Sequence, residues 1–262
     1  MGLKYSRHES MDFQSPPEQL QLLAHQVHIW RADLQVSAET IQQLQSTLST
    51  DESQRAARFR FNKDRFAFIA ARGILRKILS QYLGCSSRSI QFSYSSKGKP
   101  TIEPEFLNTL GQNPQVSHPQ LYPQFNLSHS QGIAIYGVTL NRQIGIDLEW
   151  MRPIESLALA ERFFSPTEYQ QLKSTPINEQ TALFYQLWVC REAYLKATGE
   201  GIAALQKIEV NLPNSEQFQI IRDQQSLNHW TLQQLHVTPG YKAAIAIEGK
   251  PLELLCWNYL SH

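Results

Sequence analysis

The 262-residue chain lacks the features that mark several specialised classes of protein. Its three cysteines, Cys85, Cys190 and Cys256, are too few and too scattered for a disulfide framework or a zinc site. No apolar run approaches the roughly 20 residues that span a bilayer, and there is no signal-peptide core. Because the formal net charge is only +1, charge favours neither nucleic acid nor a membrane as partner. We therefore expect a cytoplasmic protein that binds neither.

Common nucleotide-binding and hydrolase motifs are absent as well. There is no P-loop, no glycine-rich dinucleotide fingerprint and no His-Glu-x-x-His sequence. Ser128 or Ser130 with His129 could belong to a hydrolase triad, but no Gly-x-Ser-x-Gly elbow surrounds either serine.

Hydrophobic periodicity predicts an α+β fold with mainly antiparallel sheets. A long helix should start near residues 49–51, break near Asn62 and stop at Gly84, and a second should run from 178 to 198 and stop at Gly199. Ser165 and Glu168 predict a capping box for a shorter helix. Residues 104–124, rich in proline, predict a surface connection. A hairpin at Asn141-Arg142 is expected to join a strand at 132–139 to one at 144–149. The other expected strands are 25–34, 90–94, 101–103, 125–130, 208–212, 218–222, 230–237, 241–248 and 252–259.

The order strand, long helix, strands occurs roughly twice. We therefore expect two pseudo-symmetric lobes, each a small, mainly antiparallel sheet packed against a long helix. The predicted division is a mobile N-terminal segment at residues 1–19, an N-terminal lobe at 20–141 and a C-terminal lobe at 142–262.

Positive charge is concentrated at residues 55–77, which hold eight Lys or Arg and a single acid. Arg58, Arg65 and Arg72 recur every seven residues and would share one helical face. Such a face is often only solvated. The alternative is an anion-binding wall, which the turn Ser96-Lys97-Gly98-Lys99-Pro100 would extend with two lysines.

Acidic residues converge in a second pattern. In the strand at 144–149, Asp147 and Glu149 share a face with Gly145, because side chains alternate. In the following helix, spacing by four aligns Glu192 and Lys196 with Trp188. If strand and helix pack together, three carboxylates and one ammonium meet, which suits a Mg²⁺ ion shared with a phosphate substrate. Each piece also has a plainer interpretation: a solvated strand end, a surface helix pair, a core tryptophan.

The order of motifs resembles a known family. The motifs are Gly-Lys-Pro, Asn-x-Ser-His-Ser, Gly-Ile-Asp-Leu-Glu, Arg-Phe-Phe-x-x-x-Glu and Trp-x-x-Arg-Glu-Ala-x-x-Lys. Together they resemble the 4′-phosphopantetheinyl transferases, specifically the larger, surfactin-synthetase-activating class of two-lobed monomers. The resemblance implies Mg²⁺-dependent transfer of phosphopantetheine from coenzyme A to a serine of an apo acyl or peptidyl carrier protein, with release of 3′,5′-ADP. Such carriers serve fatty-acid, polyketide and nonribosomal peptide synthesis.

The resemblance also implies roles for individual residues. Glu192 would act as the base or position it, and Lys196 would face the phosphates. The implied metal ligands are Asp147, Glu149 and Glu192. The implied coenzyme A ligands are Arg55, Arg72, Lys99, Ser128, His129, Arg191 and Lys196.

Arg191 departs from the family pattern, because the family commonly has lysine at that position. Arginine keeps the charge but does not give up a proton, so only an electrostatic role toward the leaving group is expected. Two alternatives to transfer stay open: a catalytically lapsed protein that binds coenzyme A or a carrier, and a Mg²⁺-dependent pyrophosphohydrolase.

Overall fold

The structure, a computed structural model, describes residues 11–110, 122–211, 217–250 and 253–260. The helices in these ranges are α1 (Ala38–Gln45), α2 (Thr50–Ala57), α3 (Asn62–Leu83), α4 (Pro104–Leu110), α5 (Ser156–Phe163), α6 (Pro166–Ser174), α7 (Ile177–Thr198) and the short 3-10 helix η1 (Ile202–Lys207). The strands are β1 (Gln26–Asp33), β2 (Phe92–Tyr94), β3 (Pro100–Ile102), β4 (Pro123–Ser130), β5 (Ile133–Leu140), β6 (Ile144–Trp150), β7 (Ile208–Asn211), β8 (Gln217–Arg222), β9 (Gln225–Ser226), β10 (Trp230–Leu235), β11 (Tyr241–Glu248) and β12 (Glu253–Asn258). No described helix is both long and apolar enough to cross a membrane.

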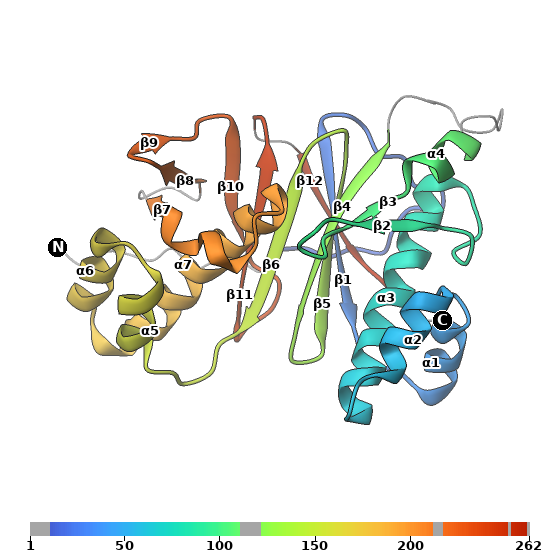
Figure 1. Cartoon of the computed structure of the whole chain (residues 1–262), viewed down its shortest axis with the longest axis horizontal. Helices are drawn as coiled ribbons and strands as arrows, with labels where there is room; N and C mark the ends of the chain where they lie inside the picture. Colours follow the sequence, from blue (N-terminus) through green and yellow to red (C-terminus); the bar gives the residue numbers. More distant parts are fainter. Residues whose placement is uncertain (1–10, 111–121, 212–216, 251–252, 261–262) are drawn as a thin grey trace.

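Two sheets stand side by side at the centre of the molecule, with helices on the outer flanks (Figure 1). The first sheet has the order β12-β1-β5-β4, and the second has the order β6-β11-β10-β8-β7 with β9 beside β8. Strands β2 and β3 form a separate hairpin. All described pairings between strands are antiparallel except that of β1 with β12, and the isolated bridge of Gln14 with Trp257 is parallel as well. The predicted α+β class and its two sheet-and-helix lobes are confirmed.

The long helices α3 and α7 give the lobes their similarity. Each has 22 residues and ends at a glycine in the left-handed conformation, Gly84 and Gly199, as predicted. Ser165 and Glu168 form the predicted capping box at the start of α6.

Three apolar clusters hold these layers together. One lies between the first sheet and α1–α3, and a second lies between the second sheet and α5–α7. The third joins the two sheets directly, with Val27 and Ile29 of β1 packed in one cluster with Ile144, Ile146 and Leu148 of β6. Because both faces of β1 and β6 are covered, these strands are buried almost throughout. The two lobes therefore share a core.

Several expectations about the chain's course were wrong. Strand β6 does not pair with β5 but opens the second sheet beside β11, so the hairpin predicted at Asn141-Arg142 is instead a crossover between sheets. Strand β12 joins the first sheet beside β1, which contradicts a C-terminal lobe extending to residue 262. Helices α1, α4 and α5 were not predicted.

The N-terminal segment also differs from the expectation. Phe13 is 8% exposed and belongs to the cluster between the sheets, and the backbone of Gln14 bonds to Cys256 and Asn258 of β12. The part of the segment from residue 11 is thus anchored, and residues 1–10 lie outside the described ranges.

Gly145 sets how closely α7 approaches β6. A Cβ atom at this position would lie 2.0 Å from the Ala193 carbonyl oxygen and 2.3 Å from the Ala197 amide nitrogen. Both atoms are backbone and cannot swing aside. Only glycine allows this contact, and the contact brings the following residues of β6 against α7.

Gly145→Ala should therefore destabilise the fold by more than about 3 kcal/mol, because the new methyl overlaps helix backbone. Gly137→Ala on β5 is the control: its methyl would meet the end of the flexible Ile144 side chain at 2.8 Å, so we expect a cost of about 1 kcal/mol. Urea denaturation measures both free energies of unfolding. Equal costs would contradict the proposed close contact.

Candidate active site

A cavity of about 350 Å³ opens at the junction between the lobes. Strands β4 and β6, helix α7 and the first residue of η1 contribute to its wall. The lining residues are Leu127, Ser128, His129, Asp147, Glu149, Trp188, Glu192, Lys196 and Ile202. The structure therefore brings together seven of the residues singled out from the sequence, all from the strand, helix and serine-histidine motifs.

Side chains of β4 fasten the two lobes where this cavity lies. Asn126, Ser128 and Ser130 alternate along the strand and face β6. The Asn126 side-chain oxygen accepts from the Ile146 amide at 3.0 Å. The Ser128 hydroxyl donates to Asp147 Oδ1 at 2.9 Å, and the Ser130 hydroxyl donates to a Glu149 oxygen at 3.2 Å. The serines therefore orient two of the acids.

Lys196 reaches the same group from α7. Its ammonium donates to Asp147 Oδ1 at 2.6 Å and to the Ser128 hydroxyl at 3.0 Å. The lysine side chain is 30% exposed, whereas that of Asp147 is 4% exposed. The ion pair thus sits at the cavity wall with its cation toward solvent, and an ammonium with three donors has one left for a ligand.

The carboxylates of Glu149 and Glu192 have little positive charge beside them to balance their own. Burial, with repulsion from Asp147 and Glu149 only partly offset by Lys196, raises the pKa of Glu192 to about 7. Burial and the Asp147 charge also raise the pKa of Glu149. Glu192 Oε1 and Asp147 Oδ2 are buried and have no hydrogen-bond partner. Burial of such oxygens costs free energy of folding unless a cation or a hydrogen-bond donor lies against them.

The donor set suits a magnesium ion only in combination with a substrate. In the described ranges, no three His, Cys, Asp or Glu side chains are arranged to hold a metal by themselves. The predicted three-carboxylate site is therefore not preformed. However, Mg²⁺ usually binds one or two protein carboxylates together with water and substrate phosphates, and two unpartnered carboxylate oxygens are present here.

His129 lies at the cavity mouth, exposed and one residue from the buried Ser128. Loss of hydration against the surrounding protein atoms and the nearby Lys196 ammonium lower the pKa of His129.

A second cavity, of about 330 Å³, adjoins the first and shares Glu149 and Trp188 with it. Its lining mixes polar residues with apolar and aromatic ones and comes from the end of β4, from β6 and the segment after it, and from α5 and α7. The remaining lining residues are Ser130, Gln131, Trp150, Arg152, Ile154, Leu159, Phe163, Phe184 and Tyr185. Trp188 stacks on Phe184 with ring centroids 5.8 Å apart. Sequence analysis missed this cavity, since only the spacing of Trp188 from Glu192 hinted at it.

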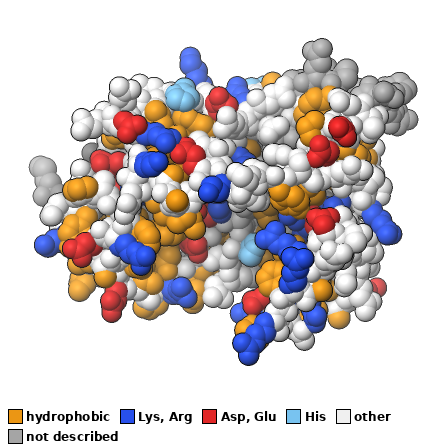
Figure 2. Space-filling view, in the orientation of Figure 1, with side chains coloured by type: hydrophobic (Ala, Val, Ile, Leu, Met, Phe, Trp, Pro, Cys, Tyr) orange, Lys and Arg blue, Asp and Glu red, His pale blue; other side chains and the backbone are white. Residues whose placement is uncertain are grey.

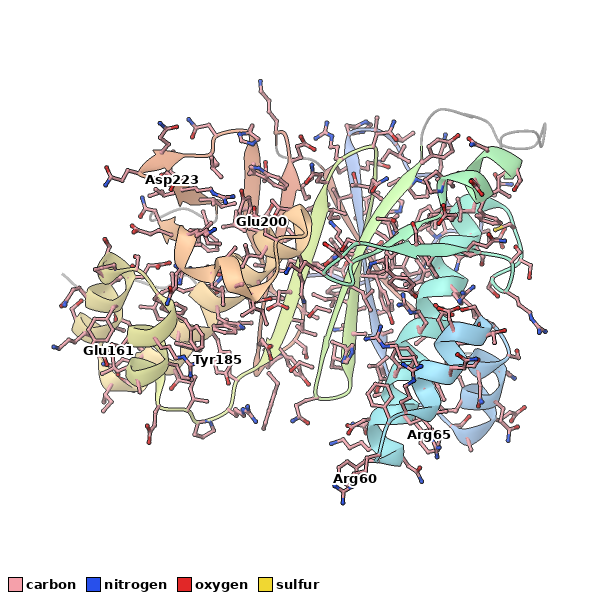
Figure 3. All side chains as sticks on the ribbon, in the orientation of Figure 1. Arg60, Arg65, Glu161, Tyr185, Glu200 and Asp223 are labelled. Atoms are coloured by element: carbon pink, nitrogen blue, oxygen red, sulfur yellow. The ribbon has the colours of Figure 1, made fainter. Side chains whose placement is uncertain are left out.

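The basic residues predicted to bind coenzyme A are more dispersed. Lys and Arg side chains gather over the α2–α3 side of the molecule (Figure 2), but the helix breaks between Ala57 and Asn62, so Arg58, Arg65 and Arg72 share no continuous face. Figure 3 shows Arg60, just before α3, and Arg65, near its start, far from Tyr185 on α7. No described contact brings these arginines to the cavity.

Two arginines of α3 instead form ion pairs inside the protein. Arg72 and Arg76 are buried and pair with the buried carboxylate of Glu52 at 3.1 Å and 2.6 Å. Arg72 also donates to the Tyr94 hydroxyl at 3.1 Å. By contrast, Arg55 is exposed, with its guanidinium over the Phe68 ring, and remains free to meet an anion.

Arg191 requires a correction. It is 0% exposed and pairs with the buried Glu168 at 2.9 Å. Its guanidinium also donates to the carbonyls of Phe163 and Ile208. The side chain therefore points away from the cavity and ties α7 to α5, α6 and β7. The expected contact with coenzyme A was wrong, because position 191 lies a quarter-turn from Glu192 on the helix, on its core side.

Comparison with known proteins identifies the family to which the chain belongs. A model described as the 4′-phosphopantetheinyl transferase superfamily matches residues 143–246, and one described as 4′-phosphopantetheinyl transferase, N-terminal, matches residues 32–137. These matches, together with a relative that is 41% identical over 93% of the chain, show that the chain belongs to the 4′-phosphopantetheinyl transferase family and is a transferase of the larger class.

Individual relatives extend over most of the chain. The 4′-phosphopantetheinyl transferase HetI of Nostoc sp. is 41% identical over 93% of this chain and 96% of its own length. The 4′-phosphopantetheinyl transferase Sfp of Bacillus subtilis is 31% identical over 81% of this chain and 88% of its own. The L-aminoadipate-semialdehyde dehydrogenase-phosphopantetheinyl transferase of Mus musculus is 25% identical, over 77% and 67%.

The structural role of Arg191 is testable. Arg191→Met should lower the free energy of unfolding by about 3–5 kcal/mol, because Glu168 would stay buried without its cation. Arg222→Met, which breaks the partly exposed pair with Glu200, is the matched control and should cost about 1 kcal/mol or less. Urea denaturation measures both. A small cost for Arg191→Met, accompanied by weaker coenzyme A binding, would restore the original prediction.

Proposed function

We propose that this protein transfers the 4′-phosphopantetheine group of coenzyme A to a serine hydroxyl of an apo acyl or peptidyl carrier protein, releasing 3′,5′-ADP. The observation that carries the proposal is the contact of Lys196 with Asp147 and Ser128, next to the unpartnered carboxylate oxygen of Glu192. Family membership supports the same reaction. Phosphoryl transfer needs positioning and charge neutralisation more than covalent help, and these residues can supply both.

We infer that Asp147 and Glu192, with Glu149 beside them, hold a Mg²⁺ ion that arrives with the pyrophosphate of coenzyme A. The unpartnered oxygens of Asp147 and Glu192 support this assignment. When bound, the ion neutralises charge on the pyrophosphate and so favours departure of 3′,5′-ADP.

Different residues of the chain would then bind the pyrophosphate, accept the proton of the carrier serine and bind the outer phosphates. The free donor of Lys196 would bind a pyrophosphate oxygen while the other two hold Asp147 and Ser128. Glu192 would accept the proton of the carrier serine, which is a weak nucleophile until a base takes that proton. His129, at the mouth, and the exposed Arg55 would meet the outer phosphates of coenzyme A.

Both lobes contribute to this cavity within one chain. Ser128 and His129 come from β4 of the first sheet, whereas Asp147, Glu192 and Lys196 come from β6 and α7 of the second lobe. We therefore infer that a monomer is sufficient for activity. The domain boundary near residues 141 and 142 and the cytoplasmic location stay predictions.

Incubation with coenzyme A, Mg²⁺ and a panel of apo carrier proteins tests the proposed reaction. Mass spectrometry should show carriers that gain one phosphopantetheine unit. Coenzyme A cleavage without carrier labelling would instead identify a pyrophosphohydrolase, and binding without turnover would identify a lapsed enzyme.

Asp147→Asn and Glu192→Gln should lower kcat by about 100-fold or more, because each removes a charged ligand of the ion or the base. The control is Asp223→Asn, in the exposed β8–β9 turn well away from Tyr185 of α7 (Figure 3), which removes the same charge without loss of activity. Near-normal turnover of either site variant at limiting Mg²⁺ would remove that residue from the site.

Lys196→Ala should lower kcat more than it weakens coenzyme A binding, because its interaction strengthens as charge builds on the leaving pyrophosphate. Single-turnover kinetics and equilibrium binding separate the two quantities. The reverse pattern would make Lys196 a binding residue only.

A further inference from the structure

The β2–β3 hairpin lies against the end of α7 through a defined turn. The Ser95 amide bonds to the Lys99 carbonyl at 2.9 Å, and the Gly98 amide bonds to the Ser95 carbonyl at 2.8 Å. The Ser95 hydroxyl also accepts from the Lys99 amide at 3.1 Å. These bonds fix the backbone at Lys99 and so the direction in which its side chain leaves the hairpin.

Lys99 crosses from this turn to the C-terminal lobe. Its ammonium donates to the Ala197 carbonyl at 2.7 Å and to the Ile144 carbonyl at 3.3 Å. Ala197 is in the last turn of α7, where carbonyls lack helical partners and carry the negative end of the helix dipole. Among the described residues, no carboxylate lies within ion-pair distance of Lys99, and burial lowers its pKa to about 8.

The turn of the hairpin lies beside two glycines that follow α7. Gly199 and Gly201 both have positive φ angles, 76° and 74°. A Cβ at Gly199 would lie 4.0 Å from Lys99 Cδ, and one at Gly201 would lie 3.9 Å from Lys97 Cδ. The turn of the hairpin therefore rests on the segment that ends α7.

The hairpin is also fastened to the N-terminal lobe. Arg72 donates to the Tyr94 hydroxyl and lies over the Phe92 ring at 5.3 Å, and both aromatic residues belong to β2. Because Arg72 is itself held by Glu52, the hairpin is supported from the core of its own lobe. A continuous set of contacts thus runs from α2 and α3 to the last turn of α7.

The two carbonyls that Lys99 binds belong to the elements that carry the cavity. Ala197 directly follows Lys196, whose ammonium contacts Asp147 at 2.6 Å. Ile144 begins β6, three residues before Asp147. Holding both carbonyls fixes the helix end relative to the strand and therefore fixes the path along which Lys196 reaches Asp147.

We propose that Lys99 is a positioning residue, which sets the place of Lys196 by binding the end of α7 to β6 and to the β2–β3 hairpin, rather than a ligand of a coenzyme A phosphate. The kinetic consequence rests on the proposed transferase function. The structural consequence, an ordered last turn of α7, does not depend on it.

The first test compares Lys99→Met, Lys99→Arg and the control Lys97→Met, which removes an exposed lysine from the same turn. Lys99→Met should lower kcat by about 10-fold while the coenzyme A Kd changes less than about 3-fold, and Lys99→Arg should recover most of the loss. A 10-fold weaker Kd with kcat unchanged would overturn the proposal, as would an equal kcat loss in Lys97→Met.

A double-mutant cycle separates positioning from general support of the fold. In the Lys196→Ala background, Lys99→Met should lower kcat by less than about 2-fold. Lys99 is proposed to act by placing the Lys196 side chain, and that side chain is absent from this background. An undiminished 10-fold loss would show that Lys99 acts independently of Lys196 and would overturn the proposal.

Hydrogen exchange gives a readout that needs no activity. The Gly199 and Glu200 amides bond to the Leu195 carbonyl, and both should exchange at least about 10-fold faster in Lys99→Met than in Lys97→Met. Unchanged exchange would overturn the proposal. If the wild-type protein failed to modify any carrier, the proposed function would fail, and hydrogen exchange would still decide the role of Lys99.

Discussion

Direct backbone contact between α7 and β6 is the constraint on which the cavity depends. Gly145 allows the helix to lie on the strand without an intervening side chain. Residues two and four positions further along β6, Asp147 and Glu149, then face the stripe of α7 that carries Glu192 and Lys196. The same strand presents its other face to the core between the sheets, so its position is fixed from both sides.

Buried carboxylates are balanced by cations to different degrees in different parts of this structure. Elsewhere the buried carboxylates of Glu52 and Glu168 have arginine partners. In the cavity, one lysine lies beside three carboxylates, and burial together with repulsion from Asp147 and Glu149 raises the pKa of Glu192 to about 7. A cavity with this deficit of positive charge suits the divalent cation and the phosphate that we propose bind there together.

Local pattern made the central elements predictable. Alternation placed the acids of β6 on one face, spacing by four placed Glu192 and Lys196 on one stripe, and left-handed glycines marked the ends of α3 and α7. These features depend on periods of two and 3.6 residues and on single-residue conformational preferences. They are properties of short segments, so the sequence contains them in full.

The sequence by itself thus determined the fold class, the long helices and the residues that could form the site. Tertiary structure alone decided which charged groups reach the cavity. Arg191 adjoins Glu192 in the chain yet pairs in the core with Glu168, whereas Lys99 binds a carbonyl 98 positions away. Partner choice between distant segments, like the return of β12 to the first sheet, depends on how whole layers pack, and no local period encodes it.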